Sequence, residues 1–373
     1  MAIIIQPYRE EHQPAVNEFN RRLQAAGAEP DLVFYRYALP QWLPPTANDS
    51  LYNEYFVAVD GGVVRGGYAL KRQNFLFPDG TVRSIGYYHH PLSEGIINKS
   101  YAPVGALLLR DAMQRSPLLY CLGMGGYDRP LPKMLVGLGW NHCAVPFYFR
   151  IVNAYRFLKE VHALRRSSML SLAMDLAAYT GVGWAALKMH RLSSRIRALR
   201  LTHYRVAEVR EFSEWSDSLW NRAEDAYAMT AVRDSGTLQT LYPASDTHFT
   251  RLKVSRDGID VGWAVVAERR RDPKYGTMRV GSIVDCWSLP DDALAVVRAA
   301  ADVLEDQGME LIVSNQSHNS WRRALKDAGF LQAESNFILA LSKQLAAQLQ
   351  PFEQTKSRFH FTRADGDGLP RNY

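Results

Sequence analysis

The stretch VRSIGYYHHPLSEGI (82–96), followed by KSYAPVGALLLRDAMQR (99–115) and LLYCLGMGG (118–126), decides the fold. Residues 82–96 alternate as a strand does, and from about Tyr101 the spacing becomes helical, with Val104, Leu107, Leu108 and Ala112 expected on one buried face. The run 118–122 is too short for another helix, which predicts a buried strand beside the first. Gly123 to Gly126 end this strand, and Gly139 closes a second short helix. A strand that leads into a helix N-terminus beside a glycine-rich gap forms a corner suited to the phosphate of a cofactor.

The composition is that of an ordinary globular protein with two domains. The chain has 373 residues, 47% hydrophobic and 22% charged. Its three cysteines (Cys121, Cys143 and Cys286) are widely spaced among apolar neighbours, so we expect buried free thiols and a reducing compartment. Three isoleucines near the start are too few for a signal peptide, and no run is long enough to span a membrane. These features favour the cytoplasm.

Two landmarks recur along the chain and indicate a duplication. Asp60-Gly61 and Asp257-Gly258 are hairpin signals 197 residues apart, and Gly139-Trp140 and Gly329-Phe330 end helices 190 residues apart. Each copy reads as hairpin, strand, helix, strand, helix and strand. We therefore expect an α/β (α+β) fold of two domains, each a mixed central sheet with helices on both faces. The expected segments are domains at 1–155 and 203–345, a basic and apolar helical linker at 156–202, and a tail at 346–373.

This order of elements resembles the GNAT superfamily of acyltransferases, in particular the tandem GNAT proteins of bacteria, including those linked to exopolysaccharide or cell-envelope assembly. The family's pyrophosphate loop reads Gln/Arg-x-x-Gly-x-Gly/Ala, and residues 99–105 correspond to it. Lys99 stands for the basic residue, Ala102 for the first glycine and Val104 for the final small residue. The resemblance implies acetyl-CoA or another acyl-CoA as donor, no metal, and direct attack by an amine. The implied cofactor-binding residues are Ser93, Lys99, Ser100, Tyr101, Ala102, Val104, Gly105, Gly123 and Gly125.

Copy two departs from this pattern at the same place. Between Asp285 and the next helix lies Cys-Trp-Ser-Leu-Pro-Asp-Asp, which has no basic residue. Asp291 and Asp292 at the helix start repel a pyrophosphate. We expect copy two to serve substrate binding or scaffolding and not to bind CoA in the family's way.

Acyl transfer to an amine needs a base for the ammonium proton and an acid for the leaving thiolate. His89, His90 and Glu94 lie at the end of the central strand of copy one, and a histidine suits the base role without tuning. Tyr127 lies where the family often places its general acid. The alternative is a half-buried polar strand whose histidines bind backbone carbonyls. The glycines at 123, 125 and 126 fit either close approach of a ligand or a tight turn.

Copy two offers candidate substrate-binding residues, each with a structural alternative. Asn315 and His318 lie between a buried strand and a helix, where Ser317 or Asn319 would serve equally as a helix cap. Arg233 and Asp285 are pocket candidates or a structural ion pair. The end of the tail lacks the remaining acidic ligands of a calcium loop, so we expect a surface-lying or disordered segment.

Residues 165–200 carry a net charge of +6, equal to that of the whole chain. Such a basic apolar segment fits either peripheral contact with the inner face of a membrane or a helical hairpin between domains. Nucleic-acid binding is disfavoured because interleaved aromatic residues are lacking. The sequence predicts an N-acyltransferase acting on a small-molecule or glycan amine, such as an amino sugar or envelope precursor. The alternatives are a non-catalytic glycan- or partner-binding adaptor at the membrane and a Fem-type aminoacyl transferase.

Overall fold

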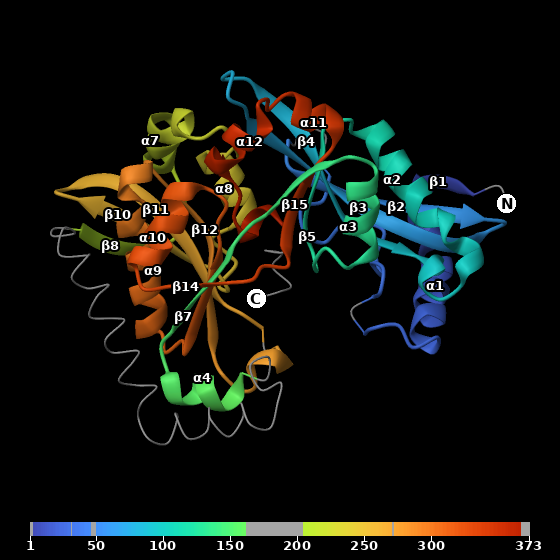
Figure 1. Ribbon diagram of the computed structural model, residues 1–373, viewed down its shortest axis with the longest axis horizontal. Coiled ribbons are helices and arrows are strands. Elements are labelled where there is room, and N and C mark those ends of the chain that lie inside the picture. The colour runs from blue at the N-terminus through green and yellow to red at the C-terminus, as the bar shows by residue number, and fades with distance from the viewer. Residues whose placement is uncertain (1–2, 31, 46–49, 162–203, 271, 367–373) are drawn as a thin grey trace. The chain divides into compact units, whose positions relative to one another are not determined.

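The computed structural model describes residues 3–30, 32–45, 50–161, 204–270 and 272–366 (Figure 1). It comprises two compact units, one formed by residues 1–143 and 339–352 and the other by 144–338 and 353–373. The linker expected at 156–202, with its basic segment 165–200, lies outside the described residues from 162 on. None of the described helices has the length and apolar character needed to cross a bilayer.

The first unit is a mixed sheet in the order β1-β2-β3-β4-β5-β15-β6. Its strands are β1 (Ile4–Pro7), β2 (Tyr52–Asp60), β3 (Val63–Leu76), β4 (Val82–Ser93), β5 (Leu119–Met124), β6 (Asn141–Ala144) and β15 (Phe337–Leu341). Its helices are α1 (Gln13–Ala25), α2 (Pro103–Arg115), α3 (Pro130–Gly137) and α11 (Lys343–Ala347), with 3-10 turns η1 (Glu10–His12), η2 (Glu94–Ile96) and η3 (Lys99–Tyr101).

The second unit repeats this plan in the order β14-β7-β13-β12-β11-β10-β8. Its strands are β7 (Phe147–Ile151), β8 (Tyr204–Val209), β10 (Thr250–Arg256), β11 (Ile259–Glu268), β12 (Val280–Ser288), β13 (Leu311–Asn315) and β14 (Leu331–Ala333), with β9 (Met229–Ala231) paired to β16 (Phe359–His360). Its helices are α4 (Ala154–Glu160), α7 (Glu214–Ala223), α8 (Ser235–Leu241), α9 (Ala293–Asp306) and α10 (Asn319–Asp327); α12 (Phe352–Thr355) follows α11.

The two copies exchange their last strands. β7 follows the first copy in sequence but lies between β14 and β13, whereas β15 follows the second copy and lies between β5 and β6. The compact units therefore differ from the expected spans 1–155 and 203–345, because each sheet is completed by a strand from the other half of the chain. The duplicated α/β plan, with mixed sheets and helices on both faces, is confirmed.

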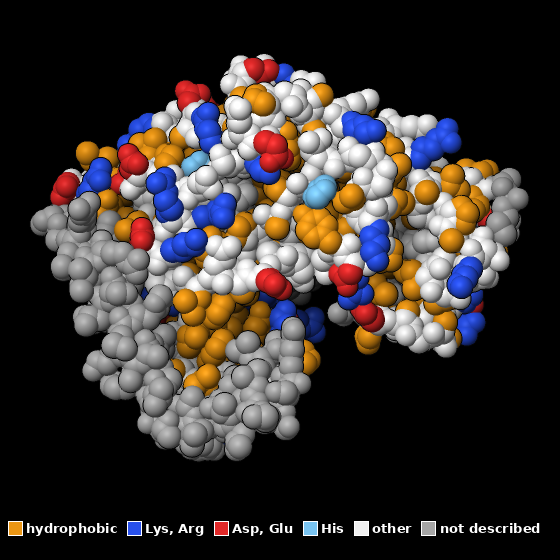
Figure 2. All heavy atoms as spheres, viewed as in Figure 1, with side chains coloured by type: hydrophobic (Ala, Val, Ile, Leu, Met, Phe, Trp, Pro, Cys, Tyr) orange, Lys and Arg blue, Asp and Glu red, His pale blue; other side chains and the backbone are white. Residues whose placement is uncertain are grey.

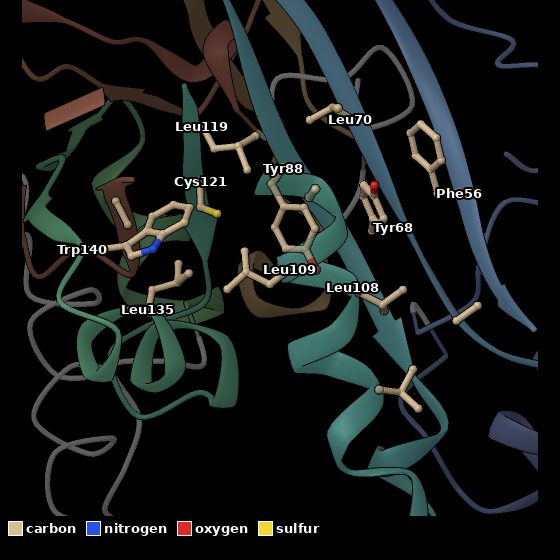
Figure 3. Close-up of a cluster of buried hydrophobic side chains, with 14 residues drawn as sticks. Phe56, Tyr68, Leu70, Tyr88, Leu108, Leu109, Leu119, Cys121, Leu135 and Trp140 are labelled. Atoms are coloured by element: carbon tan, nitrogen blue, oxygen red, sulfur yellow. The ribbon is translucent and has the colours of Figure 1, made fainter. Parts of the chain in front are cut away.

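Both faces of the first sheet are packed by helices. On one face Val104, Leu108, Leu109 and Ala112 of α2 are buried against β4 and β5. The same cluster contains Tyr88, Leu119, Cys121, Leu135 and Trp140, and the Tyr88 ring lies beside Leu109 (Figure 3). On the other face α1 contributes Val16, Phe19 and Leu23. Pro103 lies in the first turn of α2, where its missing N–H costs no helical hydrogen bond, and Arg115 lies in the last turn, where its positive charge interacts favourably with the helix dipole.

The expectation of a surface-lying or disordered tail is wrong for residues 359–365. Phe359, His360 and Phe361 are fully buried, and Asp365 is 2% exposed. The reason is chemical: three consecutive aromatic rings gain free energy by burial, and Asp365 finds a cationic partner inside the unit.

Candidate acyl-transfer site

The central strands of the first unit separate soon after they meet. The parallel pairing of β4 with β5 comprises Gly86 with Leu119 and Tyr87 with Tyr120. Beyond Tyr87 the two strands continue without further ladder pairs, and the Tyr87 hydroxyl donates to the carbonyl of Leu122 at 2.8 Å. Six residues of β4 thus extend past the last ladder pair.

A β-bulge bends β4 at this point. Ala69 of β3 pairs with His89 and Gly67 with Leu92, so two residues of β4, His90 and Pro91, oppose one residue of β3. Pro91 has no N–H to give to the ladder, and His90 adopts a φ of 51°. A bulge of this kind kinks a strand locally, and here it begins three residues beyond the last β4–β5 pair.

His89 lies two residues beyond the last β4–β5 pair and is 7% exposed. Its Nε2 is 3.3 Å from Asn53 Oδ1, and its Nδ1 is 3.5 Å from the Tyr35 hydroxyl. The Asn53 amide is oriented by donation from Nδ2 to the carbonyl of Trp42 at 3.0 Å. Since Asn53 Oδ1 can only accept, Nε2 carries the hydrogen and Nδ1 is the basic nitrogen of His89.

His90 is held against the loop that precedes β2. Its Nε2 is 2.7 Å from the carbonyl of Val33, and its ring is stacked on Phe34 with centroids 6.3 Å apart. This contact corresponds to the structural interpretation of the two histidines, in which a ring nitrogen donates to a backbone carbonyl.

Glu94 lies at the centre of a buried ion cluster. Its carboxylate accepts from Arg22 at 3.0 Å and from Arg65 at 2.9 Å, and Arg65 also stacks over the Tyr101 ring. Burial raises the pKa of Glu94, but the hydrogen bonds and charges of the two arginines outweigh it and leave the pKa lowered. This direction is opposite to the raised pKa that a general base needs. Neither arginine was singled out from the sequence, because they lie on distant segments.

The loop between β4 and α2 is drawn into two short turns. The Ser93 hydroxyl accepts from Gly95 N at 3.0 Å, and Ala102 N donates to the carbonyl of Lys99. Lys99, Ser100 and Ala102 are exposed, whereas Tyr101 is half-buried.

The first turn of α2 offers backbone amides at its open side. Pro103 has no N–H, and the N–H groups of Val104 and Gly105 have no carbonyl partner within the helix. The Val104 side chain is fully buried in the core, so it points away from this corner. A Cβ placed on Gly105 would meet nothing within 4 Å, so the surface there is open.

Tyr127 follows β5 and pairs with a histidine that the sequence did not single out. The Tyr127 hydroxyl is 3.0 Å from Nδ1 of His142 on β6, and the rings meet edge to face. Burial, and then the neighbouring Cys143, raise the pKa of Tyr127, so the phenol keeps its proton at neutral pH. The preceding turn contains Gly123 and Gly125 at φ of 100° and 79°, with Met124 between them at 66°.

In copy two, Arg233 and Asp285 form a structural ion pair, as the alternative interpretation held. Arg233 is 1% exposed and contacts Asp285 at 3.0 Å and Asp365 at 2.9 Å. Burial is the largest cause of the raised pKa of Asp285, which the charge of Arg233 opposes. Thr362 completes the cluster by donating to Asp285 at 3.0 Å.

Asn315 and His318 are also engaged within the unit. Asn315 accepts from Arg363 at 2.8 Å, and His318 itself caps α10 by accepting from Ser320 N. The helix cap is therefore His318, and the expectation that Ser317 or Asn319 fills this role is wrong. Burial, with the charges of Arg358 and Arg323, lowers the pKa of His318 to about 4, so its ring is neutral and free to accept.

The chain's own segment 359–365 packs beside the separating strands of copy two. β12 and β13 pair from Val280 to Ser282, and beyond them Phe361 bonds to Ser317, Thr362 to Asp285 and Arg363 to Asn315. Asp292 at the helix start is paired with Arg256. Residues 359–365 therefore fill the space beside the separating strands of the second unit.

The surface visible in Figure 2 carries acidic and basic side chains interspersed with one another. Among the described residues, no group of three or more His, Cys, Asp or Glu has the geometry to hold a metal ion. All three cysteines are free thiols.

Neither a known family's sequence profile nor a curated protein sequence matches this chain. Solved structures do. A protein of unknown function from Enterococcus faecalis V583, named as a probable N-acyltransferase, is 9% identical with a TM-score of 0.50 over 94% of this chain and 74% of its own.

Two further structures have TM-scores below 0.5. N-myristoyltransferase of Saccharomyces cerevisiae with bound myristoyl-CoA is 8% identical at 0.48, over 91% of this chain and 79% of that one. A tandem GNAT protein from the clavulanic acid biosynthesis pathway is 10% identical at 0.46, over 91% and 98%.

The duplicated sheets, the bulged fourth strand and the separation of the central strands define a tandem GNAT-like fold. The likeness to the Enterococcus protein shows this fold alone, since 9% identity is too low to carry an activity.

Proposed function

We propose that the protein is an N-acyltransferase that uses an acyl-CoA donor in its first unit. The observation that carries the proposal is the end of β4–β5 pairing at Tyr87, which leaves His89 just past the last ladder pair and directly before the bulge at His90-Pro91. A basic nitrogen at the end of a separated strand is the arrangement needed to take a proton from an attacking amine.

The donor's pyrophosphate fits the corner formed by η3 and the first turn of α2. The amides of Val104 and Gly105 are free of intrahelical partners, and Gly105 leaves their approach open. Arg22 and Arg65 together exceed the single charge of Glu94 by one, and Lys99 is exposed on the same loop. This positive balance favours a diphosphate. The second unit lacks this corner, because Asp292 is at the helix start and residues 359–365 fill the region beside its strands.

The proposed reaction forms an N–C bond and breaks the C–S bond of the thioester. His89 Nδ1 takes the ammonium proton, while Nε2–H stays bonded to Asn53. The thiolate that leaves receives a proton from Tyr127, whose raised pKa keeps the phenol protonated and whose oxygen contacts His142. The second proton of the attacking nitrogen is released as the amide forms and passes through solvent to restore the Tyr127 phenol. Acetyl-CoA is the proposed donor, and a small amine or amino sugar is the proposed acceptor.

Calorimetry with acetyl-CoA and turnover of an amine panel test this proposal. We expect His89→Gln to lower turnover by about 10²–10⁴-fold while the Kd for acetyl-CoA stays unchanged. His248→Gln is the matched control, since His248 is 67% exposed and bonded to Asp246 in the second unit. Absence of acetyl-CoA binding at millimolar concentration would refute the proposal, as would equal turnover of the His89 and His248 variants.

A further inference from the structure

A tyrosine from the loop that precedes β2 lies against His89. Tyr55 of β2 is opposite Ala69 of β3, and Ala69 is opposite His89 of β4. Opposed residues share a face of the sheet, so the small Ala69 leaves room between the two larger rings. Tyr35 contacts both of them: its ring is stacked on Tyr55 with centroids 4.0 Å apart, and its hydroxyl oxygen is 3.5 Å from His89 Nδ1.

This contact engages the basic nitrogen of His89. Because Asn53 Oδ1 holds the hydrogen on Nε2, the Tyr35 hydroxyl donates to Nδ1. A neutral imidazole has one lone pair at Nδ1, so an amine cannot bond to that nitrogen while the hydroxyl does. His89 is 7% exposed whereas Tyr35 is half-buried, which makes the tyrosine the more accessible of the two residues.

The backbone on both sides of Tyr35 is anchored. Asn20 of α1 donates from Nδ2 to the carbonyl of Phe34 at 2.9 Å and accepts from the Phe34 N–H at 2.7 Å. On the other side, the Tyr8 hydroxyl donates to the carbonyl of Arg36 at 2.9 Å. The Phe34 ring also meets the Tyr35 ring edge to face at 5.4 Å. A movement that uncovers the basic nitrogen would disturb these contacts, so a proton reaches that nitrogen more readily through the hydroxyl.

We infer that Tyr35 is a further catalytic residue, which contacts the acceptor amine and passes its proton to His89. The ammonium N–H donates to the Tyr35 oxygen, and that oxygen gains the ammonium proton as its own hydroxyl proton moves to His89 Nδ1. Tyr35 is neutral before and after this step, and the positive charge moves from the ammonium to the imidazole. The amine keeps the lone pair with which it attacks the thioester. A contact of 3.5 Å in an unliganded site is expected to shorten when substrate binds.

Asn53 acts as a positioning residue in this relay. Its Oδ1 keeps the hydrogen of His89 on Nε2, and its own orientation is fixed by donation from Nδ2 to the carbonyl of Trp42. The inference rests on the proposed function, since it names the group through which the same base receives its proton.

Nitrogen-15 NMR of the histidine rings tests the relay geometry without any substrate, and His89→Gln identifies the signals of His89. We expect hydrogen on Nε2 and an accepting Nδ1. Tyr35→Phe keeps the ring but removes the hydroxyl, so the Nδ1 signal should move, whereas Tyr37→Phe, which alters a tyrosine 51% exposed in the same loop, should leave it in place. Asn53→Leu should distribute the hydrogen over both nitrogens. Hydrogen on Nδ1 in the wild type, or a signal that does not move in Tyr35→Phe, would overturn the inference.

Turnover of acetyl-CoA with D-glucosamine and with benzylamine tests the catalytic role. Tyr35→Phe should lower kcat about 10²-fold with the KM for acetyl-CoA unchanged, and Tyr37→Phe should match the wild type. The wild-type rate should depend on deuterium content along a curve, because two protons move, and the Tyr35→Phe rate should depend on it linearly. Equal kcat of the two variants would overturn the inference. A higher kcat of Tyr35→Phe would also overturn it and show that the hydroxyl only blocks His89.

The two proposals fail separately. Absence of acetyl-CoA binding would overturn the proposed function, and the NMR signals of His89 would still report the contact with Tyr35. Acetyl-CoA turnover that Tyr35→Phe leaves unchanged would overturn the inference alone.

Discussion

Replacing Arg233 by methionine should destabilise the second unit more than any surface ion-pair substitution. Arg233 is 1% exposed and donates to both Asp285 and Asp365, and its Nη1 also donates to Thr230 at 3.1 Å and to the carbonyl of Ala231 at 3.0 Å. Methionine keeps much of the volume but leaves two carboxylates buried without their cation. Removing one partner of a buried pair costs about 3–5 kcal/mol of unfolding free energy.

The pH dependence of the loss follows from the carboxylates. The pKa of Asp285 is raised above 3.8 in the folded state, so the native protein binds that proton more tightly than the unfolded chain. The contribution of Asp285 to the free energy of unfolding is therefore fully present below pH 3.8 and is lost as pH rises through the folded pKa. Removing Arg233 takes away the charge that holds this pKa down, so the difference between variant and wild type grows with pH.

Urea unfolding at pH 4 and pH 7.5, followed by tryptophan fluorescence, measures this effect, because Trp263, Trp287 and Trp321 are all fully buried in the second unit. The matched control is Arg279→Met, whose pair with Glu268 is about half exposed and is worth at most about 1 kcal/mol. The reasoning is refuted if the two variants lose equal stability at pH 7.5, or if the loss in Arg233→Met is as large at pH 4.

Three further predictions concern the first unit. Glu94→Gln should lower the free energy of unfolding by about 1–3 kcal/mol at pH 7. The lowered pKa of Glu94 gives stability that is present above pH 4.5 and is lost as pH falls through the folded pKa, so the difference from wild type should decrease in acid unfolding curves. A difference that stays constant with pH would contradict this. Gly66→Ala should destabilise the protein by about 1–3 kcal/mol, because the added Cβ would lie 2.6 Å from the carbonyl of Leu92. Gly105→Ala should stabilise it by about 0.5–1 kcal/mol, because the added Cβ meets nothing within 4 Å and alanine favours the helix. Thermal unfolding ranks the two variants, and the reverse order would contradict the packing argument. Tyr127→Phe should lower kcat by about 10²-fold with KM unchanged, and wild-type kcat should show no alkaline loss below pH 10; an earlier loss would exclude a raised pKa for Tyr127.

Local patterns sufficed to predict much of the architecture. The apolar spacing after Tyr101 predicted α2, although Leu109 takes the buried position expected of Leu107, which is half-buried. The two Asp-Gly hairpins and the glycine that follows each later helix revealed the duplication, because both signals depend on a few neighbouring residues.

Long-range partners could not be predicted in this way. Arg22 and Arg65 are 72 and 29 residues from Glu94, and Arg233 is 132 residues from Asp365. The sequence around a charged residue does not indicate which distant partner it contacts. For this reason the sequence predicts a catalytic role for Glu94 and places Asp365 in a surface-lying or disordered segment. A role for His142 could not be predicted for the same reason, since only the fold places His142 beside Tyr127.

The exchange of β7 and β15 makes the two repeats mutually dependent. Cutting the gene between them yields two polypeptides that each hold a strand belonging to the other's sheet, so neither fragment closes its core until its counterpart is present. A mutation that abolishes ligand binding in the second repeat still leaves that repeat indispensable to the first. A second copy whose separating strands are packed by residues 359–365 is therefore still needed, because deleting it would remove β15 from the sheet of the unit in which acyl transfer is proposed.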